Sequence, residues 1–260
     1  MRISFFICDH RVRNPKSPNI DNAHKGESNL DRIRLVPGTA KRFLDSFENN
    51  DFALHKFNDP RVLLEGGATI RSSWISDGLY MERFSGLNRS EVLGPSGIGS
   101  FAFVRDSVVG PFSHIGARSS VGGFEHPLEN VSTSSFFWGQ NVTFWLEENY
   151  LSATKLSKPV PKITVLCADT WVAANSVVKS GVKMNVGSVL GAGSVLTRDT
   201  EPYGVYVGNP ARLLYSRFDH GLVKDLIASN WWDLPPSVLF GLNFSNPKLF
   251  LEELYELGRS

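Results

Sequence analysis

The chain has 260 residues and a mass of 28.8 kDa, with 27 Lys and Arg against 26 Asp and Glu. A net charge of +1 provides no general electrostatic attraction to nucleic acid or to an anionic membrane. The hydrophobic share of 42%, with 20% charged residues, is typical of a chain that buries a core and excludes wholesale disorder.

Only two cysteines occur, Cys8 and Cys167, and they lie far apart in the sequence. This number excludes a disulfide framework and a four-thiolate zinc site, and it suits a reducing compartment. The apolar run Ile3–Cys8 is too short for a signal peptide, and no later run is long enough to span a bilayer. We therefore expect a soluble, cytoplasmic protein without a membrane span.

Residues 1–60 contain no repeat. Ile3–Ile7 is expected to form a short strand, and Thr39 is a candidate N-cap for a helix that ends near Asn50. We interpret this segment as an extension that caps a larger body.

A period of six begins weakly after residue 61. The spacing holds through two triplets that a one-residue slip separates, and Leu64 with Ile70 indicates a first, degenerate coil. Glycines that follow several of these positions suit a turning backbone. The two triplets are Val92, Ile98 and Val104, and then Val109, Ile115 and Val121.

The stretch between residues 125 and 161 interrupts this period and is rich in aromatic residues. A loop of this length is uncommon without a function. We expect it to form a flap over a neighbouring subunit, a wall of a substrate pocket, or both. The candidate substrate-binding residues are Phe136, Phe137 and Trp138.

The strongest signal is an uninterrupted repeat from residue 166 onward. Aliphatic residues recur every six positions, and most are followed four positions later by a small or β-branched residue. This period fits neither an α-helix nor a plain strand. The aliphatic residues are Leu166, Val172, Val178, Met184, Leu190 and Leu196, and the others are Thr170, Ser176, Val182, Ser188 and Ser194.

A period of six predicts a coil with three flat faces, each about six residues long. The aliphatic side chains would point into the resulting prism, and the small residues would permit tight corners. Successive coils are expected to stack at about 4.8 Å, the ordinary distance between strands. Such a prism exposes a strand edge at each end, which we expect the terminal segments to cover at least in part.

The composition changes after Pro210. Helical spacing predicts one helix over Asp219–Ser229 and another over Pro247–Leu257. The predicted fold class is mainly β. Its parts are an N-terminal extension over residues 1–60, a parallel β-helix over 61–210 with residues 125–161 inserted as a protruding loop, and a C-terminal helical segment over 211–260.

Four stretches of the chain carry recognisable motifs. They are Ile115–Gly122 followed by Glu125-His126-Pro127 and Val131-Ser132-Thr133, Asp169–Asn175 (DTWVAAN), Gly191–Asp199 (GAGSVLTRD), and Pro202–Arg212 with Gly208-Asn209-Pro210. Together they resemble the left-handed β-helix acyltransferases with hexapeptide repeats, in particular the xenobiotic and polysaccharide O-acetyltransferases. The resemblance covers residues 90–235 or thereabouts and implies a left-handed coil.

The resemblance also implies an acetyl-CoA-dependent acetyltransferase. It would act on a hydroxyl of a sugar, a polysaccharide precursor or an antibiotic, with His126 as the base and with active sites between the subunits of a homotrimer. Trp171 would lie beside the acetyl end of acetyl-CoA, and the backbone N–H groups of Ala174 and Ala192 along its pantetheine arm. The residues implied near the adenosine and phosphates are Thr197, Arg198 and Arg212, and arginine suits phosphate because its planar fork gives two bonds.

Acyl transfer from a thioester needs a base for the acceptor's proton and donors for the developing negative charge. Of the six histidines, His126 is the best candidate for the base, because it lies where the coil opens into the long loop. Glu125 points the opposite way on an extended chain, so it is a poor candidate for orienting the imidazole, which a backbone carbonyl could do instead. His114 lies two hexads earlier and is interpreted as structural.

Three other interpretations stay open. An amine acceptor, such as an amino sugar, would use the same base as a hydroxyl. A non-catalytic assembly protein would not require both His126 and Trp171. A zinc carbonic anhydrase needs three converging histidines, whereas the coil region holds only His114 and His126, so no metal is expected. Neither cysteine lies in a recognisable Cys–His pairing, so no covalent acyl-enzyme is implied.

Overall fold

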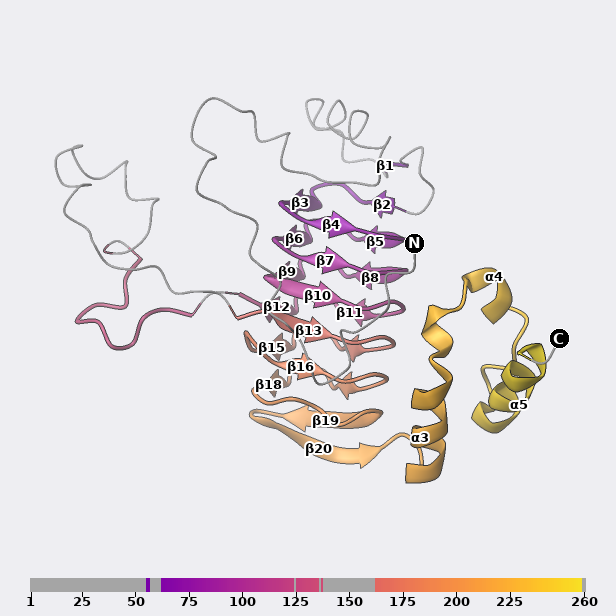
Figure 1. Cartoon of the computed structure of the whole chain (residues 1–260). Coiled ribbons are helices and arrows are strands. Elements are labelled where there is room, and N and C mark those ends of the chain that lie inside the picture. Colours follow the sequence, from indigo (N-terminus) through magenta and orange to yellow (C-terminus); the bar gives the residue numbers. More distant parts are fainter. Residues whose placement is uncertain (1–54, 57–61, 124, 136, 138–161, 259–260) are drawn as a thin grey trace.

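The structure, a computed structural model, describes residues 55–56, 62–123, 125–135, 137 and 162–258. It confirms the predicted fold class, because parallel coils stack into a three-sided β-helix that short helices follow (Figure 1). The strand and the helix expected within residues 1–60 lie outside the described residues. None of the helices in the described part of the chain has the length and apolar character that a membrane span requires.

The strands of successive coils form three sheets. The nine-stranded sheet contains, in spatial order, β1 (His55–Lys56), β2 (Val62–Leu64), β5 (Leu79–Met81), β8 (Ser96–Ile98), β11 (His114–Ile115), β14 (Trp171–Val172), β17 (Val189–Leu190), β19 (Gly204–Gly208) and β20 (Ala211–Ser216). The six-stranded sheet contains β3 (Thr69–Arg71), β6 (Gly86–Asn88), β9 (Phe103–Arg105), β12 (Ser120–Gly122), β15 (Val177–Val178) and β18 (Val195–Leu196). The five-stranded sheet contains β4 (Trp74–Ile75), β7 (Glu91–Val92), β10 (Ser107–Val109), β13 (Thr164–Leu166) and β16 (Lys183–Met184).

The aliphatic residues predicted to point into the prism all do so. Each of them, from Leu64 to Leu196, is at most 3% exposed, and together they form one continuous core. The small residues predicted near the corners, Thr170 to Ser194, are buried as well. Full burial of one such aliphatic side chain contributes roughly 1.5–3 kcal/mol, so this repeated column is the main source of stability.

The coils before the insertion are one residue shorter than those after it. Ser73 and Ser90 occupy equivalent places in two consecutive coils before the insertion and lie 17 residues apart. Lys162 and Ser180 occupy equivalent places in two consecutive coils after most of the insertion and lie 18 residues apart. The difference arises at the corner between the six-stranded and five-stranded sheets, here called the short corner (residues 71–73, 88–90 and 105–107). The one-residue slip in the sequence is therefore a structural feature that recurs in each of these coils.

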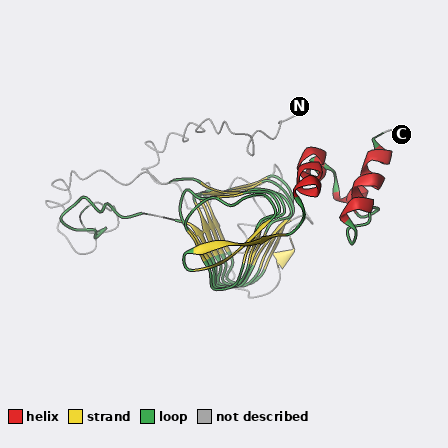
Figure 2. Cartoon of the chain, turned by 90° about the horizontal axis from the view of Figure 1, so that it is seen from below, coloured by secondary structure: helices red, strands yellow, loops and turns green. Residues whose placement is uncertain are grey.

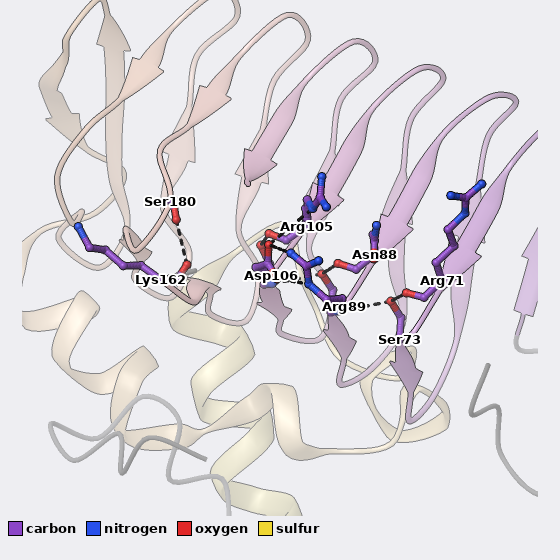
Figure 3. Close-up of polar contacts among 10 residues, drawn as sticks. Arg71, Ser73, Asn88, Arg89, Arg105, Asp106, Lys162 and Ser180 are labelled. Atoms are coloured by element: carbon purple, nitrogen blue, oxygen red, sulfur yellow. Dashed lines mark hydrogen bonds and ion pairs between the residues drawn. The ribbon is translucent and has the colours of Figure 1, made fainter. Parts of the chain in front are cut away.

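Each short corner turns through one left-handed residue that a buried serine follows. The hydroxyl of Ser90 donates to the carbonyl of Asn88 at 2.9 Å and accepts from the N–H of Ser107 at 3.2 Å (Figure 3). In the same way, the hydroxyl of Ser73 donates to the carbonyl of Arg71 and accepts from the N–H of Ser90. This ladder satisfies backbone groups that the tight turn takes out of the sheets. The left-handed residues are Ser72, Arg89 and Asp106, with φ of 48°, 48° and 50°.

The insertion replaces the short corner of the coil that contains β11 and β12. Strand β12 ends at Gly122, and the chain returns at Thr164, which pairs with Ser107 of the preceding coil. Thr164 takes the place of the corner serine, because its Oγ1 accepts from the N–H of Gly181 at 3.0 Å. Residues 123–163 therefore leave and re-enter the prism at one corner without shifting the strands above and below it.

Antiparallel strands cover both edges of the nine-stranded sheet. β1 pairs with β2 at one edge, and β20 pairs with β19 at the other. An uncovered strand edge is a template for association with another chain. For this sheet, the expectation that terminal segments cover the strand edges is confirmed.

The C-terminal helices stand against the corner between the five-stranded and nine-stranded sheets. Viewed along the prism, the described part of the insertion leaves from one corner and the helices stand at another (Figure 2). The helix expected over Asp219–Ser229 begins at His220, with Asp219 as its N-cap, and Pro247 opens the last helix as predicted. The elements are α3 (His220–Ser229), the 3₁₀ helix η2 (Trp231–Asp233), α4 (Pro236–Leu239) and α5 (Pro247–Leu257).

A second apolar cluster joins these helices to the coils. The ring of Trp231 stacks on Phe112 of the prism with 5.5 Å between centroids, and Phe250 of α5 meets it edge-on at 6.1 Å. Cys167 is 2% exposed within this cluster, as expected for a packing residue.

An ion pair fastens the same corner beside the DTWVAAN motif. Nη1 of Arg217 lies 3.0 Å from a carboxylate oxygen of Asp169 and 2.8 Å from the carbonyl oxygen of Gly187. Burial raises the pKa of Asp169, and the Arg217 guanidinium opposes that shift. Because Asp169 lies two positions before Trp171, this pair holds the turn from which β14 begins.

Candidate active site

His126 stands at the start of the insertion, and its side chain is exposed. Its Nδ1 lies 2.6 Å from the backbone carbonyl oxygen of Thr133. A carbonyl oxygen can only accept a hydrogen bond, so Nδ1 carries the hydrogen of this bond. A backbone carbonyl thus orients the imidazole, and in the neutral ring this arrangement places the lone pair on Nε2.

Glu125 points away to the base of the insertion. Its carboxylate lies 3.1 Å from Nζ of Lys162 and 3.4 Å from Nζ of Lys179. The hydrogen bond from Lys162 lowers the pKa of Glu125, so the carboxylate stays ionised at neutral pH. These exposed pairs add little stability, but they join the outgoing and returning ends of the insertion to the next coil.

Trp171 stands on the outer face of the nine-stranded sheet and is 50% exposed, while its neighbour Val172 fills the core. Ala174 lies at the corner that follows. A Cβ atom at Gly116, in the preceding coil, would lie 2.6 Å from the Ala174 nitrogen. Within the described part of the chain the N–H of Ala174 has no hydrogen-bond acceptor. Gly116 therefore permits a close approach of the two coils, as Gly99 and Gly110 do at Ala117 and Ala168. The N–H of Ala174 is called open here because no described group accepts from it.

Two further predicted residues continue this face toward the C-terminal coils. Ala192 lies at the same corner as Ala174 one coil later, where the N–H of Gly193 donates to the Ala174 carbonyl at 3.0 Å. Arg212 lies on β20 at the end of the nine-stranded sheet, opposite Val207, and its side chain is exposed. Ala174, Ala192 and Arg212 thus follow one another along the prism toward its C-terminal end.

The remaining predicted residues lie elsewhere. Thr197 and Arg198 follow β18, so the six-stranded sheet separates them from Trp171; both are exposed. Phe137 lies in the insertion and is 44% exposed. Phe136 and Trp138 lie outside the described residues.

His126 and Trp171 belong to different sides of the prism. His126 follows the six-stranded sheet at the short corner, whereas Trp171 lies on the nine-stranded sheet. One chain therefore does not bring the base and the tryptophan onto the same face. Among the described residues, no group of three or more His, Cys, Asp or Glu side chains gathers to hold a metal ion.

The contacts of two residues were not found from the sequence. Thr133 belongs to the histidine motif, but it holds His126 through its carbonyl oxygen, which every residue type carries, so the motif does not indicate which residue makes this contact. Gly116 could have been found, because it is a glycine in an outward-facing position of a strand column, next in space to the motif that contains Ala174.

Comparison with known proteins finds acetyltransferases among those similar to this chain. No model of a known protein family matches the chain. A chloramphenicol acetyltransferase of Agrobacterium fabrum is 30% identical over 133 residues, which are 49% of this chain and 60% of that protein. A probable macrolide acetyltransferase of Lysinibacillus sphaericus is 27% identical over 158 residues, 59% of this chain and 85% of that protein.

The chain is a β-helix of hexapeptide repeats, and over about half of its length it is similar in sequence to these acetyltransferases. The chain spans about 60% of the length of the chloramphenicol acetyltransferase that it matches. Among solved structures, a substituted form of AntD, an N-acyltransferase from Bacillus cereus, is 18% identical with a TM-score of 0.48. That alignment covers 65% of this chain and 89% of AntD.

Proposed function

We propose that the protein transfers the acetyl group of acetyl-CoA to a hydroxyl group of a sugar, a polysaccharide precursor or an antibiotic. The observation that carries this proposal is the orientation of His126, whose Nδ1 donates to the Thr133 carbonyl, so that Nε2 is the ring nitrogen proposed to act as the base. The homology to chloramphenicol and macrolide acetyltransferases supports the reaction class.

In the proposed reaction His126 acts as a general base. Nε2 accepts the proton of the acceptor hydroxyl while the hydroxyl oxygen attacks the thioester carbon. The carbon–sulfur bond then breaks, and the proton passes from Nε2 to the departing thiolate of coenzyme A. Transfer is direct within a ternary complex and no group on the protein is acylated.

The open N–H of Ala174 is the proposed donor to the thioester oxygen. Negative charge develops on that oxygen during the attack, and a fixed backbone donor stabilises it without reorganisation. Trp171 would cover the acetyl end, and Ala192 would contact the pantetheine arm. Arg212 would bind phosphate, and Thr197 with Arg198 would contact the adenosine end from the neighbouring sheet.

A complete site would require more than one copy of the chain. Because His126 and Trp171 lie on different sides of the prism, a second copy is needed to bring an imidazole against the face that carries Trp171. We therefore propose a homotrimer in which each site lies between two subunits, with Phe136, Phe137 and Trp138 of the insertion lining the acceptor side.

The function is tested by measuring release of free coenzyme A thiol from acetyl-CoA. The acceptor panel is made of chloramphenicol, macrolides, simple sugars and nucleotide sugars, each with and without the protein. Acceptor-dependent thiol release, with an acetyl ester found by mass spectrometry, would support the proposal. Acetylation of an amine only would change the acceptor class, and no release with any acceptor would reject the proposed function.

The phosphate contacts provide a separate prediction. Arg198→Ala is expected to raise the KM for acetyl-CoA by roughly 5–30-fold, the effect of losing one or two kcal/mol of charge-assisted bonding, with a smaller effect on the acceptor KM. The control is Arg71→Ala, an equally exposed arginine on the same sheet at the opposite end of the prism. A larger rise in the acceptor KM than in the acetyl-CoA KM would remove Arg198 from the acetyl-CoA site.

A further inference from the structure

The outer face of the nine-stranded sheet carries a single row of residues that runs through four consecutive coils. Parallel register places Tyr80 beside Gly97, Gly97 beside His114, and His114 beside Trp171. Side chains alternate along a strand, and Ile115 and Val172 fill the core, so His114 and Trp171 both point outward. Adjacent strands lie about 4.8 Å apart, which makes these two residues direct neighbours.

The imidazole of His114 lies over Gly97. A Cβ atom at Gly97 would be 2.6 Å from Nδ1, 3.1 Å from Cε1 and 3.7 Å from Cγ of His114. Any other residue at position 97 would displace the ring, so this glycine makes room for it. Nε2 is the ring nitrogen farther from the sheet. The side chain is exposed, and its ring has no hydrogen-bond partner among the described residues.

The other polar side chain of this row is already engaged. The hydroxyl of Tyr80 donates to a carboxylate oxygen of Glu65 at 2.6 Å. That bond is the largest of the causes that raise the pKa of Tyr80 to about 12, and it lowers the pKa of Glu65. Tyr80 therefore presents a fixed ring at one end of the row, and His114 presents the uncommitted polar group between two aromatic side chains.

The location of His114 relative to the open N–H of Ala174 indicates which of the two substrates the imidazole would contact. Gly116 lies two residues after His114, and a Cβ atom there would lie 2.6 Å from the Ala174 nitrogen, so His114 and this N–H lie close together along the prism. From Ala174, the residues proposed to bind acetyl-CoA continue toward the C-terminal coils, through Ala192 to Arg212. The acceptor must approach the thioester from the other side, where His114 lies.

We infer that His114 is an acceptor-positioning residue, with Nε2 hydrogen-bonded to a polar group of the acceptor. The inference rests on the proposed function. It assigns the acceptor a ring that packs between Tyr80 and Trp171 and a hydroxyl or carbonyl within reach of Nε2. The residue does not remove the reacting proton, which remains the role of His126, and it replaces the structural role expected from the sequence.

The first test is a pair of substitutions, His114→Ala and His114→Gln. The assay is thiol release from acetyl-CoA, with whichever panel acceptor the unmodified protein acetylates. We expect His114→Ala to raise the acceptor KM by about 5–30-fold, the effect of one lost hydrogen bond, and to leave the acetyl-CoA KM unchanged. His114→Gln retains a donor and an acceptor and should recover part of the loss. An unchanged acceptor KM, or an equal rise in the acetyl-CoA KM, would overturn the inference.

The second test displaces the ring without removing it. Gly97→Ala places a methyl group where the His114 ring lies, so it should raise the acceptor KM in the native background and have no further effect in His114→Ala. Equal effects of Gly97→Ala in both backgrounds would show that it acts through the backbone and would contradict the inference. If the unmodified protein acetylates no acceptor, the proposed function fails and this inference fails with it. If the unmodified protein is active and substitution of His114 leaves the acceptor KM unchanged, only this inference is rejected.

Discussion

Replacing His126 with alanine is expected to lower kcat by about 10²–10⁴-fold, the usual contribution of a positioned general base. The side chain is exposed, and its Nδ1 donates to the Thr133 carbonyl within the insertion. The substitution removes no core contact, so the β-helix should keep its circular dichroism spectrum, melting temperature and oligomeric state. The measurement is steady-state thiol release at saturating acetyl-CoA and acceptor.

A matched control is His220→Ala. His220 is also exposed and lies at the first turn of α3, which stands at a different corner of the prism from the insertion. It should leave kcat within about twofold of the native value, because it lies outside the proposed site. If His126→Ala retained native turnover while folded, the base would have to be another group, and the bond to Thr133 would only order the insertion.

The core of the β-helix could be predicted from the sequence because its rule is local. Each face of the prism needs one aliphatic residue that points inward, so Leu166 through Leu196 repeat without interruption. The earlier coils obey the same rule, but their short corners remove one residue per coil. The corners at Ser72, Arg89 and Asp106 therefore break the period of six, and the corresponding stretch reads as degenerate although its core is equally buried.

The arrangement of the site depends on contacts that the sequence does not record. His114 and Trp171 are direct neighbours in space although residues 123–163 separate their coils in the chain. Counted along the sequence, His114 belongs to the hexads before the insertion, and its spacing from His126 indicates a structural residue. The insertion leaves and rejoins the prism at one corner, so the strands before and after it pair directly. His114 therefore lies beside Trp171 of the DTWVAAN motif.

Leu190→Ala is expected to lower the free energy of unfolding by about 2–5 kcal/mol. Leu190 is 0% exposed in the column of aliphatic residues, and strands above and below it are held by backbone bonds that limit collapse around the cavity. In a stacked coil the loss is transmitted to the neighbouring turns, because each coil contacts only the next. Denaturant unfolding followed by circular dichroism measures the change.

The adjacent Val189→Ala is the control for this loss. Val189 lies on the same strand and points outward, so its substitution removes fewer contacts and should cost less than about 1 kcal/mol. A large difference between the two neighbours follows directly from the alternation of inward and outward side chains. Equal losses from Leu190→Ala and Val189→Ala would mean that β17 is covered on both faces, for example by another copy of the chain on the face that carries Trp171. That result would bear on the proposed trimer as directly as on the core.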